Sequence, residues 1–371
     1  MNIKYKIQRF IDKITKRDKT YKSIISDNAP WVYISYIPEV FYKQKNLGYM
    51  NGHQSRRETI EMVRCFNNLG YNVFMTHFDN PTFPNVDVKI LFGLEPVFTE
   101  ACRIYSDAKK IYYATGAYYG HQNSMIESRT NYFNIKHAAN YPLLRLVKED
   151  ERIELADKIL QIGSKYTIQT YPEKYREKIT TIHQSCSIVN CITMEQHGND
   201  YMWIGGGGAI LKGLDLVIDY FVCHKDMILH VIGNIENDFL EAYSSIDLSN
   251  VIFYGHMNTA SEEFRKVIAK CSFVVYPSCT EGGVPGSVIT SMYYGLIPIV
   301  SKWAAFDEIE SYGYVINELQ DIDIERAIEW SLALDSNYKR SLSLKCSKFA
   351  QQTYNIDNFK KELYKYFENI I

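Results

Sequence analysis

The stretch Cys271–Ser301, CSFVVYPSCTEGGVPGSVITSMYYGLIPIVS, decides the fold class. It opens with a run of apolar and β-branched residues that Pro277 ends, as expected for a short buried strand. Glycines then surround Glu281, a helix begins near Ser287, and a second buried strand follows at Ile297–Ser301. A buried strand, a helix and another buried strand form one unit of a parallel sheet that helices cover.

The same alternation of apolar runs and helical spacing extends along most of the chain. Further buried strands are expected at Trp31–Ile37, Asn72–His77, Val88–Phe92, Lys110–Ala114, Ile159–Ile162, Ile179–His183, Tyr201–Gly205, Met227–Gly233 and Val251–Gly255. The strand signal is weakest around residues 186–200, where we place a linker. We therefore predict an α/β protein with two doubly wound, Rossmann-like domains, at residues 1–190 and 191–354. The amphipathic last helix, residues 355–371, is expected to pack on the domains, with a return to the first domain as one option.

Length and composition narrow the class of protein further. The 371 residues suffice for two medium domains or one large barrel, and 46% hydrophobic with 23% charged residues is typical of a globular protein. The eight cysteines are scattered and show no zinc spacing, so we expect neither disulfides nor a bound metal. No stretch has the pattern of a signal peptide or of a membrane-spanning helix, so the chain is expected in the cytoplasm.

A second informative stretch is Trp203–Asp215, WIGGGGAILKGLD. A strand ends in four glycines, and Lys212 follows as the next helix begins. Glycines let backbone N–H groups approach an anion, and a helix N-terminus adds partial positive charge, so phosphate is the expected ligand. The spacing fits neither GxGxxG nor GxxxxGK[ST], and a plain strand-to-helix turn is the alternative. Glu281, at the end of another buried strand, is a suitable acceptor for sugar hydroxyls.

These motifs, in this order, resemble those of the retaining, GT-B-fold glycosyltransferases of family 4, of the kind that builds bacterial surface polysaccharides. The resemblance covers most of the C-terminal half: Lys212-Gly213 after the glycine turn, Leu229–Gly233, Val251–Gly255, and the pattern from Pro277 through Glu281-Gly282 and Gly295 to Pro298-Ile-Val. In the N-terminal half it is limited to Gly48–Gly52, Leu69–Val73 and Thr115–His121. It implies two facing Rossmann-like domains with a cleft between them.

The resemblance also implies roles for individual residues. A nucleotide sugar would lie in the cleft, Lys212 would neutralise its pyrophosphate, and Glu281 would bind hydroxyls of the donor sugar. His121 would approach that sugar from the facing domain. Further donor contacts would come from Gly206, Gly207, Gly208, Gly282, Gly283, Thr290, Gly255, His256 and Met257, the last three near the nucleobase.

Two positions depart from the family pattern. The arginine usual in the glycine turn is replaced by Gly207, and the second glutamate, which binds ribose, is replaced by Thr290. A threonine hydroxyl binds ribose more weakly than a carboxylate does. Weak donor affinity, an unusual nucleotide and lost activity all remain open.

The acceptor side is less specific. Residues 43–57, KQKNLGYMNGHQSRR, combine glycines with basic residues, and Gly52, His53 and Arg56 are candidate contacts for a phosphate-bearing acceptor; a solvated loop is the alternative. Residues 1–20 form a basic amphipathic segment, suited either to an anionic membrane surface or to docking on its own domain. Asp321-Ile-Asp323 has the form of a metal-binding DxD motif, but we interpret it as the start of a helix.

We therefore predict a cytoplasmic, metal-independent, retaining glycosyltransferase that requires no cofactor besides its nucleotide-sugar co-substrate. The acceptor would be a glycan or a lipid-linked saccharide, at the inner face of the membrane if the basic N-terminus binds there, and nucleic acid is not an expected partner. Two alternatives remain: an isomerase of the same fold that acts on a nucleotide sugar, and a non-catalytic binder of nucleotides or glycans.

Overall fold

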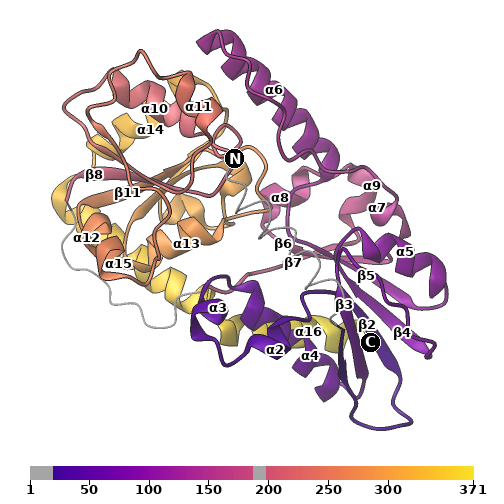
Figure 1. Ribbon diagram of the computed structural model, residues 1–371. Helices are drawn as coiled ribbons and strands as arrows, with labels where there is room; N and C mark the ends of the chain where they lie inside the picture. The colour runs from indigo at the N-terminus through magenta and orange to yellow at the C-terminus, as the bar shows by residue number, and fades with distance from the viewer. Residues whose placement is uncertain (1–19, 187–197) are drawn as a thin grey trace.

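The protein consists of two α/β domains, each built on a parallel sheet flanked by helices (Figure 1). The computed structural model describes residues 20–186 and 198–371. The predicted amphipathic segment at the N-terminus and most of the predicted linker lie outside the described residues. The two sheets confirm the predicted class of two Rossmann-like domains.

The first sheet has seven strands in the order β1-β3-β2-β4-β5-β6-β7. Every neighbouring pair is parallel except β1 with β3. The strands are β1 (Tyr21–Ser23), β2 (Trp31–Tyr36), β3 (Asn72–His77), β4 (Val88–Gly93), β5 (Lys109–Ala114), β6 (Lys158–Ile162) and β7 (Ile179–Ile182). All but β1 fall where the sequence predicts a strand. The edge strand β1 escaped prediction because its three residues include no fully buried side chain.

The second sheet has six strands, all parallel, in the order β10-β9-β8-β11-β12-β13. The strands are β8 (Asp200–Ile204), β9 (Leu229–Ile232), β10 (Val251–Phe253), β11 (Cys271–Tyr276), β12 (Ile297–Ser301) and β13 (Tyr314–Ile316). Strands β8 and β11 are neighbours, so the glycine turn after β8 and the loop of Glu281 after β11 meet at one edge of the sheet. This order of strands, not their proximity in sequence, assembles the site.

Helices cover both sheets. The first domain contains α2 (Val40–Lys43), α3 (Leu47–Asn51), α4 (Ser55–Asn68), α5 (Val97–Ile104), α6 (Tyr119–His137), α7 (Arg152–Leu155), α8 (Lys165–Gln169) and α9 (Glu173–Arg176). The second contains α10 (Leu214–Val222), α11 (Asn237–Glu241), α12 (Glu262–Ile268), α13 (Gly286–Tyr293), α14 (Asp321–Leu332) and α15 (Ser336–Thr353), and α16 (Ile356–Ile370) ends the chain. Among the helices described, none combines the length and apolar character needed to cross a membrane.

Helix α6 links the domains. It follows β5 of the first domain, yet Ile126 and Phe133 are buried in the hydrophobic core of the second. The Phe133 ring stacks on Phe239 at 5.4 Å, and Arg129 forms a buried ion pair with Asp215 of α10. No sequence pattern predicted this crossing.

Helix α16 crosses in the opposite direction. After α15 in the second domain it returns to the first, where it lies beside α4 (Figure 1). Phe359, Leu363 and Phe367 are buried in the first domain's core, and the Phe367 ring lies 4.4 Å from that of Phe66. Burying several large apolar side chains holds the terminal helix there, at roughly 1.5–3 kcal/mol for each.

Candidate functional site

Lys212, Tyr276 and Glu281 form a hydrogen-bonded triangle at the carboxyl edge of the second sheet. The Lys212 Nζ donates to Glu281 Oε1 at 2.9 Å and to the Tyr276 hydroxyl at 2.8 Å. That hydroxyl donates to Glu281 Oε1 at 3.2 Å. The Lys212 and Glu281 side chains are only 14% and 23% exposed, so the ion pair is shielded from water over most of its surface. The sequence analysis named both charged residues but gave Tyr276 no role.

The environment keeps both members of this pair charged. Burial alone would raise the pKa of Glu281, but the Lys212 ammonium, the Tyr276 hydroxyl and the nearby Arg145 charge together lower it. Burial would lower the pKa of Lys212, but Glu281 and Tyr276 outweigh that effect and raise it. Lys212 is therefore a fixed positive charge at the end of the glycine turn.

Close packing at the ends of the strands explains why the turn requires glycine at Gly213. This residue has φ of +68°, a left-handed conformation, and a Cβ there would lie 2.2 Å from the carbonyl oxygen of Pro277. The contact holds the start of α10 against the end of β11, which brings Lys212 to Glu281.

The backbone N–H groups of the glycine turn already bind an anion, the carboxylate of Glu236. Gly208 N–H donates to Glu236 Oε1, and Ala209 N–H donates to Oε2 at 3.3 Å. On the opposite side of the turn, Arg145 Nη1 donates to the carbonyl of Gly207 at 2.9 Å. Sequence reasoning missed both side chains. Only Glu236 left a signal, because it closely follows strand β9 of the same sheet.

The first domain covers the Glu281 loop with bare backbone. Gly116, after β5, forms an antiparallel bridge with Glu281. A Cβ on Gly282 would lie 2.8 Å from Gly116 Cα, and a Cβ on Gly283 would lie 2.7 Å from Gly163 Cα. Glycines on both sides thus let the two domains approach to backbone contact at this loop.

Two cavities lie along the cleft between the domains. The larger, of about 780 Å³, is lined by Gly48, Asn51, Gly52, His53, Gln54, Ile204, Gly205, Gly206, Gly207, Lys212, Ile232, Gly233, Asn234, His256, Met257, Asn258, Thr259, Ala260, Tyr276, Pro285, Gly286, Ser287 and Thr290. The glycines of the turn contribute backbone to one wall of this cavity, and the remaining lining residues come from both domains. Its volume is within the range of small-molecule sites.

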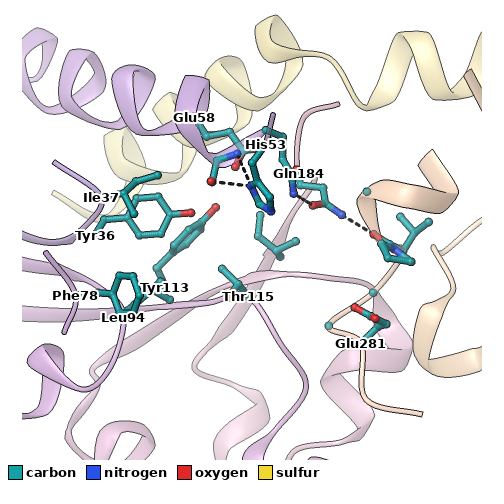
Figure 2. Close-up of a pocket in the computed structure, with 18 of the residues that line it drawn as sticks. Tyr36, Ile37, His53, Glu58, Phe78, Leu94, Tyr113, Thr115, Gln184 and Glu281 are labelled. Atoms are coloured by element: carbon teal, nitrogen blue, oxygen red, sulfur yellow. Dashed lines mark hydrogen bonds between the residues drawn. The ribbon is translucent and has the colours of Figure 1, made fainter. Parts of the chain in front are cut away.

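The smaller cavity, of about 450 Å³, adjoins the larger one, and Figure 2 shows its lining. His53 and Gln54 line both. The wall from the first domain is mostly aromatic and aliphatic, with Tyr36, Ile37, Phe78, Leu94 and Tyr113, and the opposite wall is the loop from Glu281 to Gly286. Aromatic faces beside polar groups are suited to sugars.

Glu58 is a buried titratable residue in the lining of the smaller cavity. Burial raises the pKa of Glu58 to about 7, although the N–H and hydroxyl of Ser185 donate to its Oε1 at 2.6 and 2.8 Å and act in the opposite direction. Gln54 donates to Oε1 of Gln184 at 2.7 Å, and Gln184 is labelled in Figure 2. The sequence analysis singled out none of these residues.

The structure brings most of the predicted site residues to these cavities but not all of them. Gly282 and Gly283 line the smaller cavity, and His256, Met257 and Thr290 line the larger. Three other predicted contacts, Gly208, Gly255 and Arg56, line neither. The Arg56 guanidinium instead lies over the Tyr49 ring, 4.0 Å from its centre, and donates to the Tyr49 carbonyl.

His121 also lines neither cavity. Its ring lies 5.6 Å from that of Trp303, and its Nε2 is buried without a hydrogen-bond partner among the described residues. Burial lowers the pKa of His121 although a hydrogen bond with the Cys279 backbone opposes this, and the Lys302 charge adds to the lowering. His121 is therefore held neutral beside the Glu281 loop.

The structure offers no sign of a metal centre in the regions it describes. Within residues 20–186 and 198–371, no group of three His, Cys, Asp or Glu side chains could hold a metal ion. Asp321 and Asp323 open α14, where Asp323 accepts from the Gln320 N–H in a capping box, so the interpretation of this motif as a helix start is confirmed.

Residues 200–333, most of the second domain, match the family model described as glycosyl transferases group 1. No curated protein matches the chain by sequence.

Solved structures match the whole fold. A glycosyltransferase from Rickettsia africae aligns with a TM-score of 0.58 at 11% identity, over 93% of this chain and 99% of that one. The lipopolysaccharide outer core galactosyltransferase WaaB aligns with a TM-score of 0.53 at 14% identity, over 92% and 98%. HepE from Anabaena, in complex with UDP, aligns with a TM-score of 0.53 at 11% identity, over 92% and 100%. Identities this low show the fold alone, and the shared fold confirms the predicted GT-B architecture. Together with the family match in the second domain, it supports a glycosyltransferase.

Proposed function

We propose that the protein is a retaining, metal-independent glycosyltransferase that moves a sugar from a nucleotide-sugar donor to a glycan or lipid-linked saccharide, in the synthesis of a bacterial polysaccharide. The observation that carries the proposal is the position of the Lys212–Glu281 ion pair. Lys212 lines the larger cavity and Glu281 the smaller, and 2.9 Å separates their charged atoms. The pair therefore lies where the two cavities meet.

This position suits the bond that a glycosyltransferase breaks. A nucleotide in the larger cavity places its diphosphate against the glycine turn and Lys212, so that the sugar extends toward Glu281 and the smaller cavity. As the bond between sugar and phosphate breaks, negative charge grows on the departing diphosphate, and a fixed ammonium stabilises that charge. The acceptor hydroxyl then attacks on the face that the leaving group vacates, and its proton passes to the departing diphosphate.

Solved relatives indicate which donor to test first. The HepE structures contain UDP, UDP with glucose, and UDP-glucose. Uridine diphosphate sugars are therefore the first donors to offer, followed by guanosine and adenosine diphosphate sugars.

The test is a sugar-transfer assay with charge-removing variants. Lys212→Ala and Glu281→Gln are each expected to lower turnover by at least about tenfold, the low end for losing a contact that matters in the transition state. Lys225→Ala is the matched control, because Lys225 pairs with Asp247 before β9 and β10, at the opposite edge of the same sheet. Turnover by Lys212→Ala or Glu281→Gln equal to that of the control would refute the assignment.

We also propose that the protein associates peripherally with the cytoplasmic face of the membrane. Two features support this: the basic residues at positions 1–20, and the excess of basic over acidic residues in the first half of the chain. Co-sedimentation with vesicles that contain anionic phosphatidylglycerol is expected to exceed that with neutral vesicles, and to fall when residues 1–19 are deleted. Sedimentation insensitive to both changes would contradict the proposal.

A further inference from the structure

The glycine turn presents two donors to an anion, and one of the protein's own carboxylates takes both. Glu236 Oε1 accepts from the N–H of Gly208 and Oε2 from that of Ala209. Gly207 leaves room for this contact, because a Cβ there would lie 3.1 Å from Glu236 Oε1. The turn thus has the geometry to bind an anionic oxygen pair, and Glu236 occupies it.

A cation from the other domain reaches the same turn. Arg145 Nη1 donates to the carbonyl of Gly207, and a Cβ on Gly208 would lie 3.3 Å from the Arg145 Cδ. Arg145 also lines the smaller cavity with Glu281, whose pKa its charge helps to lower. Arg145 thus contacts the glycine turn near Glu281, and its Nη1 donates there to a neutral carbonyl.

The segment that carries Arg145 is anchored at both ends. The side chain of Asn134 on α6 forms two hydrogen bonds with the backbone of Tyr141: it donates to the carbonyl at 3.0 Å and accepts from the N–H at 2.8 Å. Asn123 of α6 brackets Val147 in the same way, at 2.9 and 2.8 Å. Between these anchors Arg145 has φ of +63°, which is uncommon for a residue with a side chain. The fold thus presents Arg145 to the turn on a fixed loop.

Two anions cannot share the same pair of N–H groups. A phosphate that approaches the turn must displace the Glu236 carboxylate or bind elsewhere, and the repulsion between the two charges adds to the competition. A guanidinium gains more from a phosphate than from a carbonyl, because charge-assisted bonds are stronger and its planar donor set matches two phosphate oxygens.

We propose that Glu236 is a built-in anion that occupies the diphosphate site of the free protein, and that Arg145 is a diphosphate ligand supplied across the domain boundary. Binding of a nucleoside diphosphate displaces Glu236 from the N–H groups of Gly208 and Ala209 and turns Arg145 from the Gly207 carbonyl to the phosphates. The proposal rests on the proposed function for the identity of the nucleotide, but the anion site itself does not depend on it.

The test measures dissociation constants by calorimetric titration with uridine diphosphate, and separately with inorganic pyrophosphate. Glu236→Gln keeps the shape of the side chain and removes its charge, and is expected to bind both ligands about tenfold more tightly than the wild type. Arg145→Ala is expected to bind both at least about tenfold more weakly, the scale of a lost hydrogen bond to a charged group. Glu241→Gln on α11 and Arg326→Ala on α14 are exposed controls and are expected to bind as the wild type does.

The two substitutions are expected to change the affinity in opposite directions. General destabilisation would instead weaken binding in both variants. Binding by Glu236→Gln no tighter than that by the wild type, or binding by Arg145→Ala equal to that by the wild type, would overturn the proposal. Guanosine and adenosine diphosphates replace uridine diphosphate if the latter does not bind. If pyrophosphate responds to both substitutions as expected but no nucleotide binds, the anion site stands and the proposed function fails.

Discussion

Replacing Arg129 or Asp215 tests whether the contact between α6 and α10 holds the two domains together. Their side chains are 4% and 2% exposed, and the Arg129 Nη2 donates to Asp215 Oδ2. Arg129 also donates to the carbonyl of Leu319 at 3.3 Å. Removing one partner leaves a charge buried without its counterion.

The expected magnitude follows from that burial. Removing one member of a buried ion pair costs about 3–5 kcal/mol, whereas replacing both by apolar residues of similar size is often neutral or stabilising. Arg129→Met and Asp215→Asn should therefore each lower the free energy of unfolding by about 3–5 kcal/mol. The double variant Arg129→Met with Asp215→Leu should lie within about 1–2 kcal/mol of the wild type.

The pH dependence of the two single variants should differ. Burial raises the pKa of Asp215, and Arg129 partly opposes that effect, so Arg129→Met raises the pKa further. An acid whose pKa is higher in the folded state than its unfolded value of about 3.9 binds more protons when folded, and stability then falls as the pH rises between the two values. The deficit of Arg129→Met should therefore grow from pH 5 to pH 8. That of Asp215→Asn should shrink as the pH rises toward the raised pKa of Asp215, because only the wild type loses stability through this titration.

Urea unfolding followed by tryptophan fluorescence measures these differences. Trp203, Trp303 and Trp330 lie in or against the core of the second domain, and the fourth tryptophan, Trp31, packs in the first, so most of the signal reports the half that contains Asp215. With a slope of about 3 kcal/mol per molar urea, the single variants should unfold at midpoints about 1–2 M lower. Single variants with unchanged midpoints, or a double variant as unstable as the weaker single one, would refute the reasoning.

Three further expectations concern local features. Gly213→Ala should lower stability by about 1–3 kcal/mol more than Gly255→Ala in urea unfolding, because both have φ of +68° but a Cβ at Gly255 meets nothing within 4 Å. Glu58→Gln should gain stability relative to the wild type as the pH rises from 5 to 7, since folded Glu58 keeps its proton up to a pKa of about 7 while the unfolded chain has already lost it, and the wild type loses stability over that range; a constant difference would contradict this. Glu362→Gln should lose more stability at pH 6 than at pH 9, because Glu362 raises the pKa of His183 and the charged pair disappears as the pH rises through that pKa; equal losses would show that the pair contributes through its neutral hydrogen bonds alone.

The sequence predicted the sheets because their strands are short apolar runs between clear breaks. A strand that is buried on both faces is apolar along its whole length, so each strand can be recognised without knowing its neighbours. It did not predict β1 or β13, which have three residues each and too little pattern to detect. It also missed the crossing of α6 into the second domain. Two of the four buried residues of α6, Arg129 and Thr130, are polar, so the buried face of this helix has a weak apolar periodicity.

The residues of the candidate site likewise fall into those that the sequence predicts and those that it does not. Lys212 and Glu281 could be found because each lies within a local motif that a strand end and a helix start impose. Arg145 could not be found, because it lies 62 residues before the carbonyl that it contacts and follows no strand. The consequences of Gly207 therefore could not be predicted from sequence, whereas the fold brings an arginine to that residue from the other domain.

The charges of the site also predict that one variant, Glu281→Gln, changes nucleotide binding and sugar transfer in different ways. In the free protein Lys212 already has a partner, Glu281, so a diphosphate must compete with that carboxylate for the ammonium. Glu281→Gln removes the competing charge and leaves Lys212 with the neutral Tyr276 hydroxyl, so this variant should bind uridine diphosphate at least as tightly as the wild type in a calorimetric titration. Its transfer rate should still fall by at least about tenfold, because the carboxylate that we propose positions the donor sugar is gone. If binding and transfer weakened together, Glu281 would act mainly by holding Lys212 in place.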